Sequence, residues 1–424
     1  MSIKLRLIIM NFLQFGVWGA YLTSMGSYLA TIGMAAYIGY FYAMQGIVSM
    51  FMPAIVGIIA DRWVPAQRLL GVCHLLAAMM MGFVGYYAIN MGEGDAVWPM
   101  FVAYSLSVAF YMPTIALSYS VAYSVLESRG EDTVVAFPPI RVWGTVGFIF
   151  SMLACDFLGF QHSAYQFVQS AMLGLILGLY CFSLPECPTA ESHGRRGLAE
   201  ALGVKAFALF KQRRMTLFFI FSMLLGVSLQ ITNGFANPFI TSFRGIEEFA
   251  STFGANHANA LISLSQVSET LCILLIPFCL KRFGIKNVML MAMFAWVLRF
   301  GLFGVGNPGS GVWMFILSMI VYGVAFDFFN ISGSLFVNTE TDPSIRASAQ
   351  GLFMIMTNGI GATIGTLGAQ AVVNHFVYAQ TEPSAQVAGW STSWLIFAGY
   401  ALVVALLFAL VFKYKHNPEA ELQH

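Results

Sequence analysis

Long apolar runs recur along almost the whole of this 424-residue chain. Each run has about 20 residues or more, the length that an α-helix needs to cross the roughly 30 Å hydrocarbon core of a bilayer. The sequence therefore predicts an all-α integral membrane protein with about twelve transmembrane helices. We place the spans near residues 7–31, 37–60, 69–90, 97–126, 140–159, 163–184, 215–241, 258–280, 286–305, 312–337, 347–374 and 393–412.

The composition agrees with this assignment. Hydrophobic residues make up 58% of the chain and charged residues only 9%, whereas roughly 25% of an ordinary soluble domain is charged. The formal net charge is +1, so the charge gives no indication of a nucleic-acid partner. The expected surroundings of the protein are a lipid bilayer.

Basic residues predict the topology, because lysine and arginine stay on the cytoplasmic side during insertion. The first apolar run follows a basic flank, but it is too long for a secretory signal and lacks a small-residue cleavage pattern, so we interpret it as a retained helix. If every span crosses, nearly all basic loop residues fall on one side. This predicts a multi-pass membrane protein with both termini in the cytoplasm. The residues behind this prediction include Lys4, Arg6, Arg62, Arg68, Arg195, Arg196, Lys205, Lys211, Lys281, Arg282, Lys413 and Lys415.

One long polar stretch, residues 185–214, separates the first six spans from the last six. The predicted organisation is an N-terminal six-helix bundle at 1–184, a cytoplasmic linker at 185–214, and a C-terminal six-helix bundle with a short tail at 215–424. Such a 6+6 arrangement is typical of transporters whose halves move about a site at the membrane midplane. The second part of the linker, residues 197–214, has apolar residues at helical spacing and a basic face, which predicts a helix along the membrane surface. We expect the protein to function as a monomer.

The cysteines and histidines give no metal or cofactor signal. The six cysteines include no C-x-x-C pair, so we interpret them as small apolar packing residues. Only His74 among seven histidines lies within a span, and we expect it to be a hydrogen-bonded structural residue. No resident cofactor or metal is predicted. Gly144, Gly147, Gly361 and Gly365 lie in apolar spans without a following lysine, so they indicate close helix packing and not a phosphate loop.

Four charged residues lie deep within predicted spans: Arg141, Glu269, Arg299 and Asp327. A charge at the centre of a span costs about 2.5–3.5 kcal/mol on the insertion scale, so such residues are usually functional. The alternative for each is a structural ion pair between helices. For Arg299, near the outer end of its span, we favour a structural role in which the long side chain reaches the water boundary.

Polar and aromatic residues share helix faces with these charges. Residues three, four or seven positions apart lie on one face of a helix. A single amide can simply bond to a neighbouring helix, but two faces that each carry amides point to a solute site. The candidate binding residues are Arg141, Thr145, Phe148, Gln230, Asn233, Gln266, Glu269, Tyr322 and Phe326, and Asp327 adjoins them.

This set predicts the chemistry of the solute. Amides and a carboxylate exchange hydrogen bonds with hydroxyl groups and ring edges, while aromatic side chains cover a flat apolar face. A nucleoside fits both requirements, and so does an aromatic glycoside. A phosphorylated solute is disfavoured, because one deep arginine beside carboxylates compensates a dianion poorly.

Several segments resemble, nearly letter for letter, the bacterial nucleoside:proton symporters of the major facilitator superfamily. The resemblance covers nearly all of the chain, although the chain departs from the family pattern at Gly234, Val324 and Asn338. It is carried by "FPPIRVWGTVGF", "FFIFSMLLGVSLQITN", "SQVSETLCILLIPF", "RFGIKNVMLMAMFAWVLRF", "SMIVYGVAFDFFNISGS" and "IRASAQGLFM".

The resemblance implies two six-helix bundles and a secondary active transporter of the bacterial inner membrane that imports nucleosides by proton symport with alternating access. It also implies that the nine candidate residues bind the substrate and that Asp327 is the proton-linked carboxylate. The proton affinity of a carboxyl group changes with its solvation and with nearby cations, so a change of exposure could load and release a proton. Glu269 is the rival for this role.

Three other classes of function compete with this one. A transporter of another neutral aromatic or glycosidic solute, selective for xanthosine or an aryl glycoside, needs only a different solute preference. An intramembrane enzyme needs a nucleophile or a metal set, and the sequence shows neither H-E-x-x-H nor G-x-S-x-G. A channel or receptor needs a filter or a large signalling domain, and the linker is too short for the latter. We therefore predict that the protein is not an enzyme.

Overall fold

The computed structural model describes residues 2–92, 96–187, 204–342 and 345–414. Most of these residues are helical, and no β-strand occurs among them. They form two compact units, one made of Met1–Thr31 and Met44–Ala201, the other of Ile32–Ala43 and Leu202–His424. The bundle and linker boundaries drawn from the sequence remain a prediction. Much of the predicted surface helix lies outside the described residues, and its described part contains the 3-10 helix η3, Val204–Lys211.

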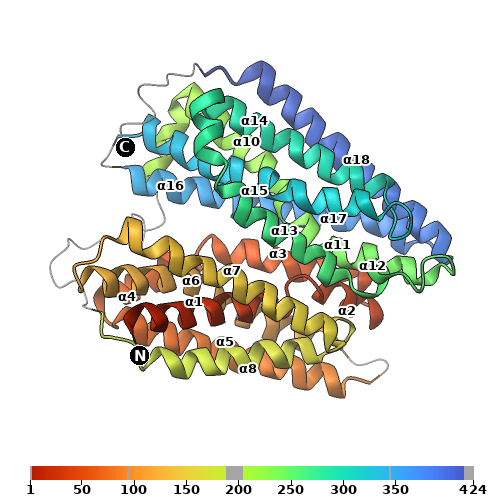
Figure 1. Cartoon of the computed structure of the whole chain (residues 1–424), viewed down its shortest axis with the longest axis horizontal. Helices are drawn as coiled ribbons and strands as arrows, with labels where there is room; N and C mark the ends of the chain where they lie inside the picture. The colour runs from red at the N-terminus through yellow and green to blue at the C-terminus, as the bar shows by residue number, and fades with distance from the viewer. Residues whose placement is uncertain (1, 93–95, 188–203, 343–344, 415–424) are drawn as a thin grey trace. The chain divides into compact units, whose positions relative to one another are not determined.

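The first unit is a bundle of long helices in which α5 packs against α6 and α8, and α1 packs against α7 and α8 (Figure 1). The predicted spans at 69–90, 97–126, 140–159 and 163–184 correspond to α5, α6, α7 and α8. The first two predicted spans are each divided between shorter helices. The helices are α1 (Ile3–Gly19), α2 (Met25–Thr31), the second part of α3 (Ile38–Ser49), whose first part belongs to the other unit, α4 (Met52–Arg62), α5 (Ala66–Asn90), α6 (Trp98–Glu127), α7 (Thr133–Phe157) and α8 (Tyr165–Cys181).

In the second unit, α14 packs against α15 and α18, and α13 also packs against α15. The predicted span at 215–241 is divided between α10 and α11. The one at 347–374 contains the π-helical stretch Ile355–Gly361 and ends where a second, Asn374–Tyr378, begins. The helices are α10 (Arg213–Leu229), α11 (Ile231–Ser242), α12 (Phe253–Asn256), α13 (Ala258–Ile273), α14 (Ile276–Val305), α15 (Val312–Glu340), α16 (Arg346–Met354), α17 (Ala362–Val373) and α18 (Pro383–Val411).

Gly284 lies inside α14, at the boundary between two of the predicted spans. Its φ of 75° and ψ of 165° interrupt helical geometry, and glycine adopts such a positive φ without the steric cost of a Cβ atom. The preceding break between α13 and α14 is followed by Pro277, in the first turn of α14. A proline there loses no hydrogen bond, because the first N–H groups of a helix have no intrahelical partner. The predicted boundary between residues 280 and 286 is therefore a real break in the helix.

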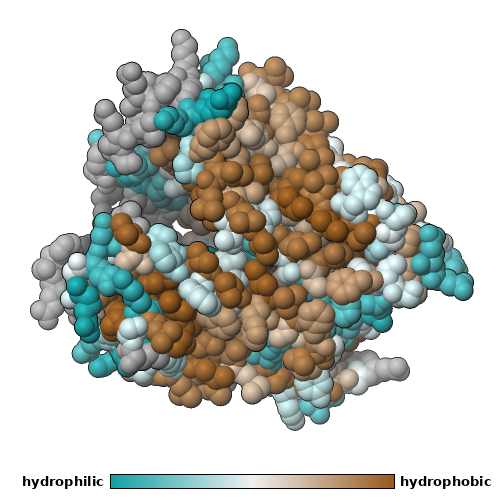
Figure 2. Space-filling model, in the orientation of Figure 1, coloured by the Kyte–Doolittle hydropathy of each residue, from teal (hydrophilic) through white to brown (hydrophobic). Residues whose placement is uncertain are grey.

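Hydropathy and length agree with a membrane protein. In the described part of the chain, eight helices are long and apolar enough to cross a bilayer, and the bent pair Ala35–Ser49 and Met52–Ala60 adds a ninth if it forms one span. Hydrophobic residues cover most of the face shown in Figure 2, while hydrophilic residues gather where helices end. Exposed apolar side chains such as Phe150, Leu179 and Leu410 are 60–74% accessible, which suits contact with lipid.

Glycines allow close helix packing, as the sequence predicts. A Cβ atom added at Gly147 of α7 would lie 2.9 Å from the Phe12 Cα atom, and one added at Gly19 of α1 would lie 2.9 Å from the Phe148 Cα atom. In the second unit, a Cβ atom at Gly365 would lie 2.6 Å from backbone atoms of Val227. The α1 and α7 backbones therefore meet directly, and this contact fixes the position of Phe148.

We expect Gly147→Ala to lower the melting temperature of the purified protein by several degrees. The added methyl group has to displace the Phe12 backbone, and overpacking of this kind costs about 1–3 kcal/mol. Gly399→Ala on α18 is the matched control, because nothing lies within 4 Å of its Cβ position. Equal melting temperatures for Gly147→Ala and the unsubstituted protein would contradict the close-packing role.

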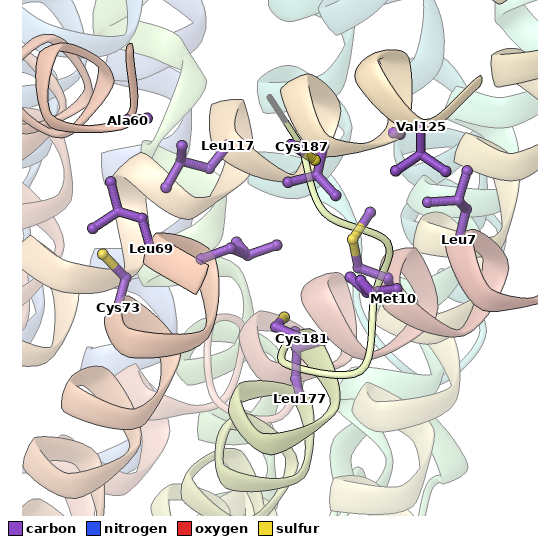
Figure 3. Close-up of a cluster of buried hydrophobic side chains, with 14 of the residues drawn as sticks. Leu7, Met10, Ala60, Leu69, Cys73, Leu117, Val125, Leu177, Cys181 and Cys187 are labelled. Atoms are coloured by element: carbon purple, nitrogen blue, oxygen red, sulfur yellow. The ribbon is translucent and has the colours of Figure 1, made fainter. Parts of the chain in front are cut away.

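Three cysteines of the first unit pack in one hydrophobic cluster, where Cys73, Cys181 and Cys187 lie among leucine, valine and methionine side chains (Figure 3). All six cysteines of the chain are buried and free. Their packing role, predicted from sequence, is confirmed for these three. Burial raises the pKa of the Cys187 thiol, which follows α8, so the thiol stays protonated.

The segment Ile32–Ala43 belongs to the second unit through hydrogen bonds to its backbone. The Gln370 side chain donates to the Ala35 carbonyl at 3.0 Å and accepts from the Gly39 N–H at 2.5 Å. Asn374 donates to the Ala36 carbonyl at 3.4 Å. The π-helical stretch that begins at Asn374 is thus directly involved in holding this segment.

Candidate functional site

Arg141 is held in the first unit by two aromatic residues that the sequence did not single out. Its Nε donates to the Tyr119 hydroxyl at 2.7 Å, and its guanidinium carbon lies 4.0 Å from the centroid of the Phe15 ring. Its Nη1 reaches the Thr145 hydroxyl at 3.5 Å. The absence of a side chain at Gly144 permits this conformation of Arg141, since a Cβ atom at Gly144 would lie 2.9 Å from Arg141 Nη1. Arg141 and Thr145 therefore come together as predicted.

Phe148 lies one turn further along α7 and is buried. The Trp18 indole meets it edge to face, with ring centroids 6.3 Å apart and planes at 89°. Trp18 also lies 6.0 Å from the Tyr111 ring. The aromatic part of the predicted stripe is thus built from three helices, α1, α6 and α7.

Gln230 and Asn233 bond to each other in the second unit. The Asn233 amide donates to the Gln230 side-chain oxygen at 2.8 Å, and both residues are half-buried. Gln230 is the residue at which α10 ends and α11 begins. The hydrogen-bonded pair therefore lies at the break between these two helices. One turn later, buried Asn237 donates to Asn259 at 2.7 Å, which extends the row of amides.

Tyr322 and Phe326 form a stacked pair on α15, with ring centroids 5.6 Å apart and planes at 15°. Helices α13 and α15 approach closely beside them, because a Cβ atom at Gly323 would lie 2.6 Å from the Ser268 carbonyl oxygen. The Ser268 hydroxyl donates to the Ile320 carbonyl. This contact brings Glu269 of α13 within electrostatic range of Tyr322. The structure thus brings together three of the candidate residues.

Asp327 follows Phe326 on α15 and is 6% exposed. It lies within electrostatic range of Tyr322 and of Cys272 on α13. Glu269 is half-buried in the same region. Two carboxyl groups therefore lie around one tyrosine in the second unit, in different degrees of contact with solvent.

The predicted exposure of the Arg299 side chain at the water boundary is wrong. A side chain that reached the water boundary would be exposed, whereas Arg299 is 1% exposed. Its Nη1 donates to the Ser318 carbonyl at 2.7 Å, and its guanidinium carbon lies 4.6 Å from the Tyr322 ring centroid. The side chain turns inward because a backbone carbonyl and an aromatic face on α15 replace water as its partners.

His74 is hydrogen-bonded, as expected for a structural histidine. Its Nε2 lies 2.7 Å from the Gln14 side-chain oxygen, and the Gln14 amide donates to the Thr114 hydroxyl at 2.8 Å. A small cavity lined by His74, Tyr111 and other residues adjoins this network and contains none of the ten predicted residues. Among the described residues, no group of three or more histidine, cysteine, aspartate or glutamate side chains could hold a metal ion.

Sequence reasoning missed the residues that support the candidate ones. Tyr119 and Phe15 hold Arg141 from other helices, and Trp18 holds Phe148. Helical spacing relates residues within a helix only, so it carries no signal for these partners. The sequence feature that comes closest to such a signal is an aromatic hydroxyl within a predicted span, as in Tyr119.

Comparison with known proteins decides the family. A family model described as "Nucleoside H+ symporter" matches residues 1–417. The chain belongs to this family. The xanthosine permease of Escherichia coli (strain K12) is 48% identical over 423 residues, which are 99% of this chain and 98% of that protein. The nucleoside permease NupG of the same organism is 47% identical over 419 residues, 98% of this chain and 97% of the relative.

Solved structures give the same assignment for this nucleoside H+ symporter family member. The crystal structure of the nucleoside transporter NupG matches with a TM-score of 0.89 and 46% identity, covering 98% of this chain and 100% of that one. A D-xylose-proton symporter matches with a TM-score of 0.69 at 14% identity, which shows a shared fold alone. The fold is the all-helical membrane fold of the major facilitator transporters, and eight helices of the described residues, or nine with the bent pair, are long and apolar enough to cross a bilayer.

Proposed function

We propose that this protein is a secondary active transporter that imports nucleosides across the bacterial inner membrane in symport with protons. Membership of the nucleoside H+ symporter family carries the proposal. Two relatives of nearly equal identity bear the names xanthosine permease and nucleoside permease. The transporter assignment leaves no role for an enzymatic reaction, and the cycle requires only solute, protons and a bilayer.

The proposed binding residues fall into two sets, one in each unit. In the first unit, Tyr119 and Phe15 pre-organise Arg141 beside Thr145, and Phe148 follows. In the second unit, amides, a carboxylate and a stacked ring pair offer both kinds of contact that a nucleoside needs. Hydroxyl groups of ribose suit the polar side chains, and the base suits the rings. The proposed substrate-binding residues are Arg141, Thr145, Phe148, Gln230, Asn233, Gln266, Glu269, Tyr322 and Phe326.

Asp327 is the proposed proton-coupling residue. It is buried among the groups that are proposed to bind the solute, so its solvation changes when the site opens or closes. Because solvation sets the proton affinity of a carboxyl group, opening of the site to either side can load or release a proton. Alternating access of the two bundles would then couple proton movement to solute movement.

The proposed orientation has both termini in the cytoplasm, and the functional unit is a monomer. The distribution of basic loop residues supports the orientation. Each unit contains its own helices and its own set of proposed binding residues, so a single chain supplies every group that the proposal requires.

Uptake into proteoliposomes tests the function. Purified protein should catalyse counterflow of labelled uridine, and an imposed proton gradient, acidic outside, should drive its accumulation. Unlabelled nucleosides and xanthosine should be compared as competitors, because this panel separates a broad nucleoside transporter from one selective for xanthosine. Saturable uptake that does not change when a proton gradient is imposed would contradict symport. Absence of uptake of every nucleoside would contradict the proposed function.

We expect Phe326→Ala to raise the uridine dissociation constant several-fold or more. The substitution removes one ring of the stacked pair, and aromatic pairing contributes roughly 0.5–1.5 kcal/mol beyond the buried area. Equilibrium binding to purified protein measures the effect. Phe412→Ala is the matched control, because Phe408 and Phe412 form another stacked pair with planes at 15° among residues not proposed to bind solute. Unchanged affinity in Phe326→Ala would assign Phe326 to helix packing.

A further inference from the structure

Arg299 is a buried cation for which the proposed transport cycle has no role. It lies within α14, one of the apolar spans, and is 1% exposed. A charge in such a position is costly, so it is usually retained for function. Its hydrogen-bond partners among the described residues are neutral: the Ser318 carbonyl at 2.7 Å, the Ser265 hydroxyl at 3.5 Å and the Met319 sulfur at 3.9 Å.

The guanidinium lies against the ring that the proposal assigns to the nucleobase. Its carbon is 4.6 Å from the centroid of Tyr322, within the range of a cation–π interaction. Trp296, one turn earlier on α14, meets the same ring edge to face, with centroids 6.0 Å apart. Phe326 stacks on Tyr322. The orientation of Tyr322 is therefore determined by one cation and two aromatic neighbours.

Arg299 also joins the helices that carry the proposed carboxylate and the proposed rings. Its side chain donates to the Ser318 carbonyl of α15, and the Ser318 hydroxyl donates back to the Arg299 carbonyl at 3.0 Å. The contact with Ser265 reaches α13 one turn before Glu269. A single side chain thus links α13, α14 and α15 at the level of Tyr322.

We propose that Arg299 is a positioning residue for nucleoside recognition, which holds the Tyr322–Phe326 ring pair in the orientation that stacks on the base. The inference rests on the proposed function, because it assumes that this ring pair binds a nucleoside. The planar guanidinium matters as well as its charge: it stacks on Tyr322 and bonds to Ser318 at once. A lysine supplies a point charge without a plane, and the two residues are not interchangeable at stacked sites.

Equilibrium uridine binding to the purified full-length protein tests this role, with melting temperature measured in parallel. We expect Arg299→Met to weaken uridine binding roughly five- to thirty-fold, as expected for loss of a desolvated cation–π contact. Arg299→Lys should restore part of the affinity. Arg282→Met is the matched control, since Arg282 lies on α14 over the Phe283 ring at 5.8 Å but is exposed. It should bind uridine as the unsubstituted protein does.

A double variant separates positioning from a merely structural role. If Arg299 acts through the ring pair, Arg299→Met combined with Phe326→Ala should lose less affinity than the product of the two single losses. The proposal would be overturned if the affinity loss of the double variant equalled the product of the two single losses. It would also be overturned if Arg299→Met left the affinity for uridine unchanged. Should Arg299→Met not fold, Arg299→Lys decides, because affinity equal to that of the unsubstituted protein would also overturn it. If the unsubstituted protein binds no nucleoside, the proposed function itself fails, and the two failures are thus distinguishable.

Discussion

Asp327→Asn should abolish accumulation of uridine against its gradient. Asparagine resembles the protonated carboxyl group in size and charge but cannot release a proton, so the site stays in one step of the cycle. A gradient of one pH unit supplies about 1.4 kcal/mol per proton, enough for roughly tenfold accumulation. Proteoliposomes with the unsubstituted protein should approach this ratio, whereas those with Asp327→Asn should stop near equal concentrations.

Binding and passive exchange should persist in Asp327→Asn, because neither needs proton turnover. Their pH dependence should be weaker than in the unsubstituted protein. Asp156→Asn is the matched control: Asp156 is another buried aspartate, at the end of α7, and it accepts a hydrogen bond from Gln161 at 3.2 Å. It is not among the proposed site residues, so this variant should still accumulate uridine.

The alternative for Asp327 is a structural role, and it predicts a different pattern. Removing one member of a buried charge pair costs about 3–5 kcal/mol, so melting temperature and expression would fall while coupling in the remaining folded protein stayed intact. A stable Asp327→Asn protein that still accumulates uridine under an imposed gradient would refute the coupling role. Uptake, binding and melting temperature on one preparation distinguish these cases.

The membrane fold was predictable because its main energetic requirement, that backbone N–H and C=O groups in lipid be hydrogen-bonded, applies to each helix separately. Each apolar run must satisfy its backbone within its own helix when no water is near, so hydropathy along the chain locates the spans. The separate cost of placing a charged side chain in lipid draws attention to the few deep charges, including Asp327 and Glu269. The Gly147 and Gly365 packing contacts were also predictable, because only glycine allows two helix backbones to meet so closely.

Tertiary partners were not predictable from the sequence. The spacing rules compare residues on one helix, whereas Arg141 is held by Tyr119 of another helix. For Arg299, hydropathy allowed either an exposed or a buried guanidinium, and the Ser318 carbonyl on α15 decides between them. Gln370 bonds to Gly39 across 331 residues of sequence, which no local pattern indicates.

The helix breaks lie between these extremes. Gly284 is a glycine in a positive-φ conformation, and a glycine in a basic loop is a recognisable signal. Gln230, where α10 gives way to α11, has ordinary dihedral angles and no flanking proline or glycine signal. The Gln230–Asn233 amide pair of the proposed site lies at this break between α10 and α11. Part of the site geometry therefore follows from packing and not from local helix propensity.

Glu269→Gln should weaken uridine binding at least about tenfold, and should weaken binding of the free base uracil by much less. Glu269 is half-buried beside Tyr322, where a carboxylate can accept hydrogen bonds from ribose hydroxyls. A hydrogen bond to a charged group is worth about 1.5–3 kcal/mol. Glutamine keeps the shape and one acceptor oxygen but loses the charge, so the effect should depend on the sugar.

Comparison of uridine with uracil isolates the sugar contact, since both carry the same base. Glu340→Gln is the matched control, because Glu340 ends α15 in an ion pair with Arg214 at 2.9 Å, at a partly exposed position. It should leave both affinities unchanged. If Glu269→Gln binds uridine as tightly as the unsubstituted protein, Glu269 does not hold the ribose. If uridine and uracil lose affinity equally, Glu269 acts on the ring platform of Tyr322 and not on the sugar.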